Sequence, residues 1–402
     1  MSIARHPETA AAAIGVSADE HHRSVAPALH LTSTFAWRNF DAKPEYSYSR
    51  SENPTRATLA SALAELEGAA SGIITSSGIA AVDLVLCLLS PGDTIVAPTN
   101  CYGGVYRLLS ARAAKQQFNV VFVDQTDDAA LNEALAAKPK LLLIETPSNP
   151  LLCITDIDKC VAAAHKVGAL VVADNTFMSP ALQKPISFGC DIVIHSTTKF
   201  INGHSDIVGG AVLTKTADLG EELTWWANCT GVGGAPFDCY LALRGLRTLF
   251  ARIERQQATT AAFVDALQSR PEVKKIYYPG LTSHPGYEIA ARQQKGFGSM
   301  LSVEFNDDVD VLRLLPSFNI FSTAESLGGF ESLTCIPAAM THASMPPEAR
   351  KVAGIADTLV RFSIGQEHAE DLIGDVFGAL DQLKVSSVRD INFSGNARKQ
   401  VA

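Results

Sequence analysis

The chain has 402 residues, a length that predicts two or three domains with a substantial buried core. Its 33 Lys and Arg against 42 Asp and Glu give a net charge of −9, which argues against a nucleic-acid-binding surface with its clustered basic residues. No apolar run reaches the roughly 18 to 20 residues that cross a bilayer, and no apolar segment follows a basic start as in a secretion signal. We therefore expect a soluble, cytoplasmic protein that binds neither nucleic acid nor membrane.

The N-terminal 60 residues show little helical or strand periodicity, and residues 46–56 are polar and rich in turn formers. We predict an extended arm here, as the first of three regions. The pattern then changes, because Leu59, Leu63 and Leu66 form one apolar stripe at helical spacing. This change predicts the first helix of a folded domain.

Short apolar runs alternate with helical segments over residues 61–256. The runs that we expect to be strands lie at 72–74, 94–97, 120–123, 141–144, 169–173, 192–194 and 210–213. Continuously apolar strands separated by helices are typical of a mostly parallel sheet that has helices on both faces. We predict a large α/β domain.

A helix predicted over residues 246–269 leads from this domain into a second region. Strands are expected there at 273–278, 300–305 and 359–364, but they do not alternate regularly with helices. This pattern is typical of an α+β arrangement. We predict a smaller C-terminal α+β domain over residues 257–402.

The eight cysteines are scattered, and no two form a Cys-x-x-Cys pair. This spacing predicts neither a zinc ribbon nor a thioredoxin-like redox motif, so we expect reduced, mostly buried thiols and no metal site. The sequence also lacks the P-loop pattern and the His-Glu-x-x-His pattern, and the glycines at 231–234 do not complete a dinucleotide-binding fingerprint. Metalloprotease, P-loop and dinucleotide-binding functions are therefore disfavoured.

Polar segments follow the apolar runs, at the point where open α/β sheets bind their ligands. These segments are 75–78, 100–104, 145–150, 174–177 and 195–199. The first of them leads into a helix, whose free N–H groups form an anion-binding site. The segments together offer a lysine, acids and an aromatic ring. They suit a flat aromatic cofactor that carries a phosphate.

Pyridoxal phosphate requires this combination of groups. Lys199 is the candidate amine for its aldehyde, and Asp174 would favour the protonated ring nitrogen that makes the ring an electron sink. Tyr102 offers a ring to stack on. Each residue alone has an ordinary structural explanation, such as a solvated loop lysine or a turn-capping aspartate. Their occurrence at successive strand ends favours the cofactor.

Several phrases of the sequence resemble the Cys/Met-metabolism family of pyridoxal-phosphate enzymes, which has fold type I. The similarity extends from about residue 24 to about residue 383. The phrases that carry it are Tyr48-Ser-Arg50, Asn53-Pro-Thr-Arg56, Ser77-Gly78, Asp174-Asn-Thr-Phe177, Ser196-Thr-Thr-Lys199 and Gly203-His-Ser-Asp206.

The resemblance implies a role for each matching residue. Lys199 becomes the lysine that links covalently to the cofactor, Asp174 the partner of its ring nitrogen, and Tyr102 the stacking ring and a possible acid or base. The family's phosphate-binding groups fall on Ser77, Gly78, Ile79, Ser196 and Thr198. Ile79 replaces the methionine usual in the family, a change of little consequence because only its backbone N–H is needed.

The resemblance also gives the arm a role in assembly. In the family, the Tyr-x-Arg pair, here Tyr48 and Arg50, reaches into the neighbouring subunit and binds the phosphate there. The implied assembly is a homo-oligomer of at least two chains with shared active sites. Members of the family are usually tetramers built from two dimers.

The substrate-binding residues follow from the same similarity. Arg361 matches the arginine that binds the α-carboxylate of the substrate, and a guanidinium suits that task because it donates two parallel hydrogen bonds. Ser326 and Asn149 belong to the same shell, and Asn149 also lies beside the cofactor. Arg107 is a second candidate cation for a substrate carboxylate.

Two residues distinguish between reactions within the family. Tyr102 is followed by two glycines, whereas methionine γ-lyases have a cysteine just after the Tyr-Gly pair. Glu325 resembles an acidic residue of the members that make or cleave the γ-carbon–sulfur bond of cystathionine, where β-lyases carry an aromatic residue. A carboxylate there can orient the distal amino group of a substrate such as cystathionine.

Four stretches resemble the proteobacterial members that catalyse γ-replacement, at 101–109, 223–228, 236–248 and 289–298. The implied reaction joins an O-acyl-L-homoserine and L-cysteine to give L-cystathionine in methionine biosynthesis, with elimination as a side reaction. Ser51 stands where these members have a second arginine, so the choice between succinyl and acetyl donors stays open. The alternatives are a γ-lyase that acts on cystathionine and an inactive binding protein of the same fold.

Overall fold

The computed structural model describes residues 5–42, 44–343 and 347–397. The chain divides into two compact units. The first unit comprises Met1–Glu254 and Pro279–Gly298, and the second comprises Arg255–Tyr278 and Ser299–Ala402.

The first unit contains a seven-stranded sheet in the order β1-β7-β6-β5-β4-β2-β3. Its strands are β1 (Ser71–Thr75), β2 (Thr94–Pro98), β3 (Asn119–Val123), β4 (Leu141–Glu145), β5 (Leu170–Asp174), β6 (Ile192–His195) and β7 (Gly210–Thr214). The pairings among β3, β2, β4, β5 and β6 are parallel, and only those of β7 with β6 and with β1 are antiparallel. The predicted mostly parallel sheet is confirmed.

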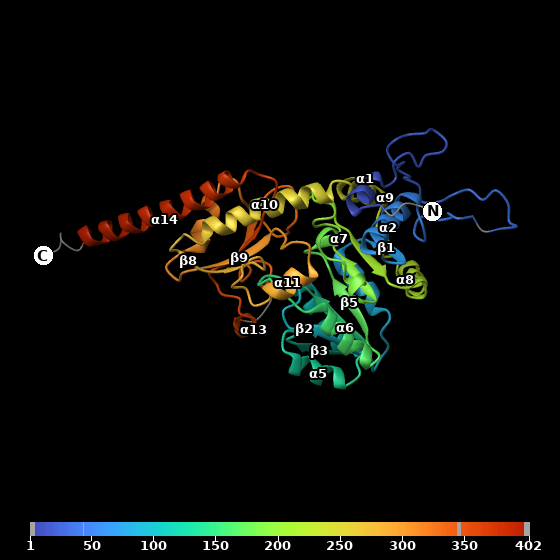
Figure 1. Ribbon diagram of the computed structural model, residues 1–402, viewed down its shortest axis with the longest axis horizontal. Helices are drawn as coiled ribbons and strands as arrows, with labels where there is room; N and C mark the ends of the chain where they lie inside the picture. The colour runs from blue at the N-terminus through green and yellow to red at the C-terminus, as the bar shows by residue number, and fades with distance from the viewer. Residues whose placement is uncertain (1–4, 43, 344–346, 398–402) are drawn as a thin grey trace. The chain divides into compact units, whose positions relative to one another are not determined.

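Helices cover both faces of this sheet, as Figure 1 shows. Within β4, Leu141 and Leu143 pack into one buried cluster, while Leu142 and Ile144 pack into another. Alternate residues of a strand point to opposite faces, so a strand that is apolar throughout requires a core on each side. The helices of the first unit are α1 (Pro7–Ala13), α2 (Pro54–Glu67), α3 (Gly78–Leu86), α4 (Gly103–Ala114), α5 (Asp128–Ala136), α6 (Ile157–Lys166), α7 (Ser179–Leu182), η1 (Pro185–Phe188), α8 (Ala217–Thr230), α9 (Pro236–Leu246) and α11 (Tyr287–Gln293).

The N-terminal region is less extended than the sequence suggests. The alanine run forms α1, and α2 begins at Pro54, five residues before the expected Leu59. Proline at the first helical position suits a helix start, and Asn53 caps this one by accepting the N–H groups of Thr55 and Arg56. Residues 46–53 form turns and irregular structure as expected, but residues 54–56 are already the first turn of this helix.

The second unit is built on a five-stranded sheet in the order β10-β11-β12-β9-β8. Its strands are β8 (Val273–Tyr277), β9 (Met300–Phe305), β10 (Ser322–Thr323), β11 (Leu333–Cys335) and β12 (Leu359–Ser363), and its helices are α12 (Val311–Leu314), η2 (Leu315–Ser317), α13 (Pro347–Val352) and α14 (Ala369–Ala397). Helix α10 (Leu249–Leu267) contributes Phe263, which packs against Phe321 and Phe362. Among the residues that the structure describes, no helix is long and apolar enough to cross a bilayer.

Residues 279–298 pack with the first unit, although they fall inside the range expected for the C-terminal domain. Gln293 in α11 explains this position. Its side chain accepts the N–H of Ile157 at 3.3 Å and donates to the carbonyl of Thr155 at 3.1 Å, inside the first unit. A buried glutamine must satisfy its polar atoms, so these bonds fix α11 where it lies.

The buried cap of α2 provides a stability test. Asn53 is completely buried, caps α2 and also donates to the carbonyl of His30 at 3.0 Å, so Asn53→Ala leaves several polar groups without partners. We expect a loss of about 2 kcal/mol in the free energy of unfolding, measured by urea denaturation. The matched control is Asp127→Ala at the exposed cap of α5, which should cost about 1 kcal/mol or less. Equal losses would contradict this account.

Candidate active site

The polar strand-end segments lie along one edge of the first sheet. Strands β2, β4, β5 and β6 are neighbours and run in the same direction, so their carboxyl ends meet there. Glu145 at the end of β4 pairs in register with Asp174 at the end of β5, and Asp174 pairs with Ile194. Lys199 follows β6 and Tyr102 follows β2. The edge thus collects the lysine, the acids and the aromatic ring.

The start of helix α3 forms an anion-binding cradle. Ser77 caps the helix, accepting the N–H of Ala80 at 3.1 Å with its hydroxyl and that of Ala81 with its carbonyl. The N–H groups of Gly78 and Ile79 lie in the first turn, where a helix provides no partner for them. A Cβ atom added to Gly78 would lie 2.7 Å from Cβ of Ser196, so only glycine allows this approach. Two amides and the start of a helix dipole are available to a phosphate.

Asp174 is embedded in hydrogen bonds at the edge. Its carboxylate accepts the backbone N–H of Thr176 at 3.0 Å, and the Thr176 hydroxyl accepts the N–H of Ser196 at 2.9 Å. Burial raises the pKa of Asp174 above its ordinary value, while the hydrogen bonds from Thr176 oppose that rise. A cationic partner would restore the ionised form. Thr176, for which the sequence suggested no role, connects the acid to Ser196, which lies against Gly78 of the anion-binding cradle.

Lys199 is half-buried in a tight turn that follows β6. Its N–H donates to the carbonyl of Ser196, and its own carbonyl accepts the N–H of Gly203 at 2.8 Å. The buried Arg252 donates to the carbonyl of Ile201 at 3.2 Å. Gly203 has a left-handed φ of +70°, and an added Cβ atom would meet the guanidinium of Arg252. A buried arginine therefore supports the turn that carries the lysine.

Thr198 also belongs to this turn, where its hydroxyl has a structural use. It donates to the carbonyl of Gly209 at 3.2 Å and accepts the N–H of the same residue at 2.9 Å. Ser196 is half-buried beside the cradle. The phosphate-binding roles of Ser196 and Thr198 stay predictions.

Tyr102 is the N-cap residue of α4 and is 44% exposed. Its ring lies back against Gly104, since an added Cβ atom there would be 2.5 Å from Cε1 of Tyr102. Its N–H donates to Oε2 of Glu145 at 2.8 Å. Asn149, which is buried, donates its N–H to Oε1 of the same carboxyl group at 3.2 Å.

Glu145 was noted in the sequence only as a strand-end residue. It is 8% exposed, and burial together with the neighbouring Asp174 raises its pKa to about 8, against the two N–H donors that favour its ionised form. A second acidic residue missed in the sequence is Glu67, which is buried and bonds Nε2 of His195 at 2.7 Å and Nδ2 of Asn175 at 2.8 Å. Glu67 is the last residue of α2, and a glutamate at a helix end gives no sign in the sequence of such a partner.

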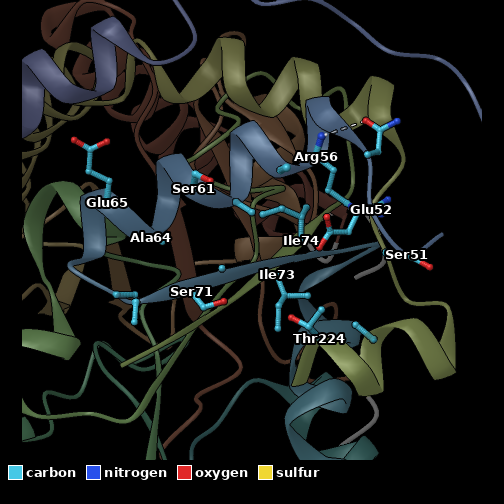
Figure 2. Close-up of a pocket in the computed structure, with 18 of the residues that line it drawn as sticks. Ser51, Glu52, Arg56, Ser61, Ala64, Glu65, Ser71, Ile73, Ile74 and Thr224 are labelled. Carbon is cyan, nitrogen blue, oxygen red and sulfur yellow. Dashed lines mark hydrogen bonds between the residues drawn. The ribbon is translucent and has the colours of Figure 1, made fainter. Parts of the chain in front are cut away.

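The arm residues Tyr48 and Arg50 lie at the surface. Tyr48 is 47% exposed, and Arg50 donates from Nη1 to the carbonyl and to Oδ1 of Asn228, both at 2.7 Å. A cavity of about 510 Å³ opens beside Arg50, with α2, β1 and α8 around it (Figure 2). Of the predicted site residues, only Arg50 lines this cavity. The role of the pair in a neighbouring chain stays a prediction.

Three predicted substrate residues lie in the second unit. Arg361 of β12 is 3% exposed and donates to the carbonyl of Ser326 at 2.8 Å. Ser326 has a φ of +100°, which costs a non-glycine residue about 1 to 3 kcal/mol, and the hydrogen bond from Arg361 helps to hold it. Glu325 is exposed next to it, and Arg107 is exposed on α4 of the first unit. Their contacts with a substrate stay predictions.

Comparisons with known proteins place this site in context. Residues 8–381 match the family described as Cys/Met metabolism PLP-dependent enzyme. The chain belongs to this family. It is 52% identical to cystathionine gamma-synthase of Escherichia coli K12 over 376 residues, 93% of this chain and 97% of that protein. It is 40% identical to cystathionine gamma-lyase of Bacillus subtilis 168 over 369 residues, 92% of this chain and 97% of that protein.

The fold is likewise that of a solved relative. The crystal structure of cystathionine gamma synthase from Xanthomonas oryzae pv. oryzae in complex with cystathionine matches with a TM-score of 0.94 at 51% identity, over 95% of this chain and 100% of that one. The family-level resemblance seen in the sequence is confirmed, and with it pyridoxal phosphate as the cofactor. The glycine-only cradle at Gly78 and the half-buried Asp174, whose pKa is raised, fit a ligand with a phosphate at one end and a protonatable nitrogen at the other.

The raised pKa of Glu145 sets a pH dependence for the cofactor-free protein. Between the ordinary pKa of about 4.5 and the folded value of about 8, the folded state keeps a proton that the unfolded state has released. Stability therefore falls as the pH rises through this window and levels off above it. Glu145→Gln removes the titration, so its free energy of unfolding relative to the wild type should increase between about pH 5 and about pH 8 in urea denaturation and stay constant above that. A difference that is constant with pH would contradict the assignment.

Proposed function

We propose that this chain is a cystathionine γ-synthase that replaces the γ-acyloxy group of an O-acyl-L-homoserine with L-cysteine to give L-cystathionine. The observation that carries the proposal is the 52% identity to the Escherichia coli enzyme of that name over nearly the whole chain, against 40% to a γ-lyase. The strand-end edge supports it, because it provides the groups that this chemistry needs.

The cofactor would be held at both of its ends. The N–H groups of Gly78 and Ile79, with the hydroxyls of Ser77 and Ser196, would bind its phosphate. Thr198 would join them by turning its hydroxyl proton from the Gly209 carbonyl to the phosphate. Asp174 would accept a hydrogen bond from the ring nitrogen, Tyr102 would cover one face of the ring, and Asn149 would lie at its rim. When bound, pyridoxal phosphate supplies an aldehyde that combines with amines and a ring that withdraws electrons from the α-carbon of an amino acid.

Lys199 would be the proton carrier of the reaction. Its amine, held by the turn that Arg252 supports, would take the proton from Cα of the substrate, release it, and then take one from Cβ as the Cγ–O bond breaks and the acyl group leaves as a carboxylate. After the cysteine thiolate adds at Cγ, the same amine would return one proton to Cβ and one to Cα. Arg361 would bind the α-carboxylate with Ser326 beside it, Arg107 a second carboxylate, and Glu325 the distal amino group.

We also propose a cytoplasmic homotetramer built from two dimers with shared sites. Tyr48 and Arg50 would reach the phosphate of the neighbouring chain. The support is exposure, since Leu31 is 69% and Phe40 92% exposed in the same N-terminal region, and such apolar side chains favour a protein contact.

The lysine provides the first test of the function. We expect Lys199→Ala to lose the visible absorbance of the bound cofactor and all turnover, because Lys199 is the one lysine in the polar strand-end segments. Lys215→Ala, at an exposed lysine after β7, is the control and should retain both. An inactive binding protein of the same fold would show no turnover even in the wild type.

The direction of the reaction is decided by product analysis. The wild-type enzyme should form cystathionine from O-succinyl- or O-acetylhomoserine plus cysteine with a higher kcat/KM than it shows for cleaving cystathionine alone. Faster cleavage of cystathionine would identify a γ-lyase instead. The ratio between the two donors also settles the leaving group that Ser51 leaves open.

The buried arginine of the second unit tests substrate binding. Arg361→Lys keeps the charge but cannot donate two parallel hydrogen bonds to a carboxylate, so kcat/KM should fall about 100-fold, mainly through KM. Arg313→Lys in α12 of the same unit is exposed and should have no effect. An unchanged KM in Arg361→Lys would remove Arg361 from the substrate site.

A further inference from the structure

We propose that Glu145 is a positioning residue for the cofactor: its carboxyl group holds the backbone of Tyr102 and of Asn149 and so sets the ring of Tyr102 in the site. The inference rests on the proposed function, since it takes Tyr102 as the residue that covers the cofactor ring. It assigns a role to a strand-end acid that makes no catalytic contact itself.

The geometry of the carboxyl group is that of a bridge between two turns. Oε2 accepts the N–H of Tyr102 at 2.8 Å and Oε1 accepts the N–H of Asn149 at 3.2 Å. The first N–H belongs to the turn after β2 and the second to the turn after β4. Glu145 is 8% exposed, so neither bond competes freely with water. Each oxygen of the carboxyl group thus accepts one backbone N–H.

The backbone N–H of Tyr102 helps to hold the position of its ring. Tyr102 is the N-cap residue of α4, so its N–H has no partner within the helix, and its side chain makes no capping bond. Its carbonyl accepts the N–H groups of Val105 and Tyr106 and so belongs to the helix. Tyr102 as a whole is 44% exposed, so packing covers only part of it. The bond to Glu145 fixes the backbone from which that ring projects.

A second contact joins the same two turns without involving Glu145. Nδ2 of Asn100 donates to Oγ of Ser148 at 3.0 Å. Removal of the Glu145 carboxyl group therefore leaves the turns connected, but it releases the backbone of Tyr102. This arrangement allows a variant that folds and yet binds the cofactor loosely.

The test compares Glu145→Gln and Glu145→Ala with a matched control variant at the amino ends of the strands, opposite the candidate site. Asp191, which precedes β6, accepts the N–H of Val171 at 2.8 Å and bonds Nε2 of His165 at 2.9 Å. Asp191→Asn therefore removes a carboxylate of the same kind, bonded to a backbone N–H, far along the strand from the candidate site. Far-ultraviolet circular dichroism checks that each variant is folded.

Two readouts on the full chain report the position of the ring independently of turnover. Pyridoxal phosphate is titrated into each cofactor-free variant, and the visible circular dichroism of the bound cofactor is recorded, since it reports the asymmetry around the ring. Glu145→Gln loses one of the two hydrogen bonds to the N–H groups of Tyr102 and Asn149, so the dissociation constant for pyridoxal phosphate should rise about 10-fold. Glu145→Ala loses both, and the dissociation constant should rise about 100-fold. Both variants should also lose visible dichroism, while Asp191→Asn stays within about twofold of the wild type.

Three results would overturn the assignment. One is a Glu145→Ala variant that binds pyridoxal phosphate as tightly as the wild type, with an unchanged dichroism band. Another is an equal loss of affinity in Asp191→Asn. If Glu145→Ala does not fold, the Gln variant decides alone, and an unchanged affinity there is the third. A wild-type chain that binds the cofactor without making cystathionine would count against the proposed function and leave this assignment standing.

Discussion

The candidate site depends on two carboxyl groups on adjacent parallel strands, of which Glu145 is buried and Asp174 half-buried. Glu145 and Asp174 pair in register, so their Cα atoms lie one strand spacing apart, and burial raises the pKa of each. Two acids so close to one another and so poorly hydrated favour a positive partner. The rest of the edge provides groups that complement these acids: a lysine after the neighbouring strand and backbone amides at the start of α3.

The sequence was informative where a physical pattern is local. Apolar runs of the right length predicted every strand of the first sheet, because a strand buried on both faces must be apolar throughout. Strand ends then indicated where Lys199, Asp174 and Tyr102 would gather, because parallel strands end at one edge. The glycine at 78, next to a helix start, was another local signal.

The rest could not be found in this way, because it depends on partners that are distant in sequence. Glu67 and His195 are 128 positions apart, and the tie from Gln293 to Thr155 spans 138. The short strands β10 and β11 have two and three residues, too few to show a period. The start of α2 was a local signal that a polar composition concealed.

The contact between Gly203 and Arg252 restricts which substitutions these two positions can accept. An added methyl group at position 203 would overlap the guanidinium, and the left-handed backbone there already disfavours any side chain. A larger residue at 203 is compatible with this turn only if the side chain at 252 becomes shorter. The two positions are thus expected to change together or not at all across an evolutionary lineage, although 48 residues separate them along the chain.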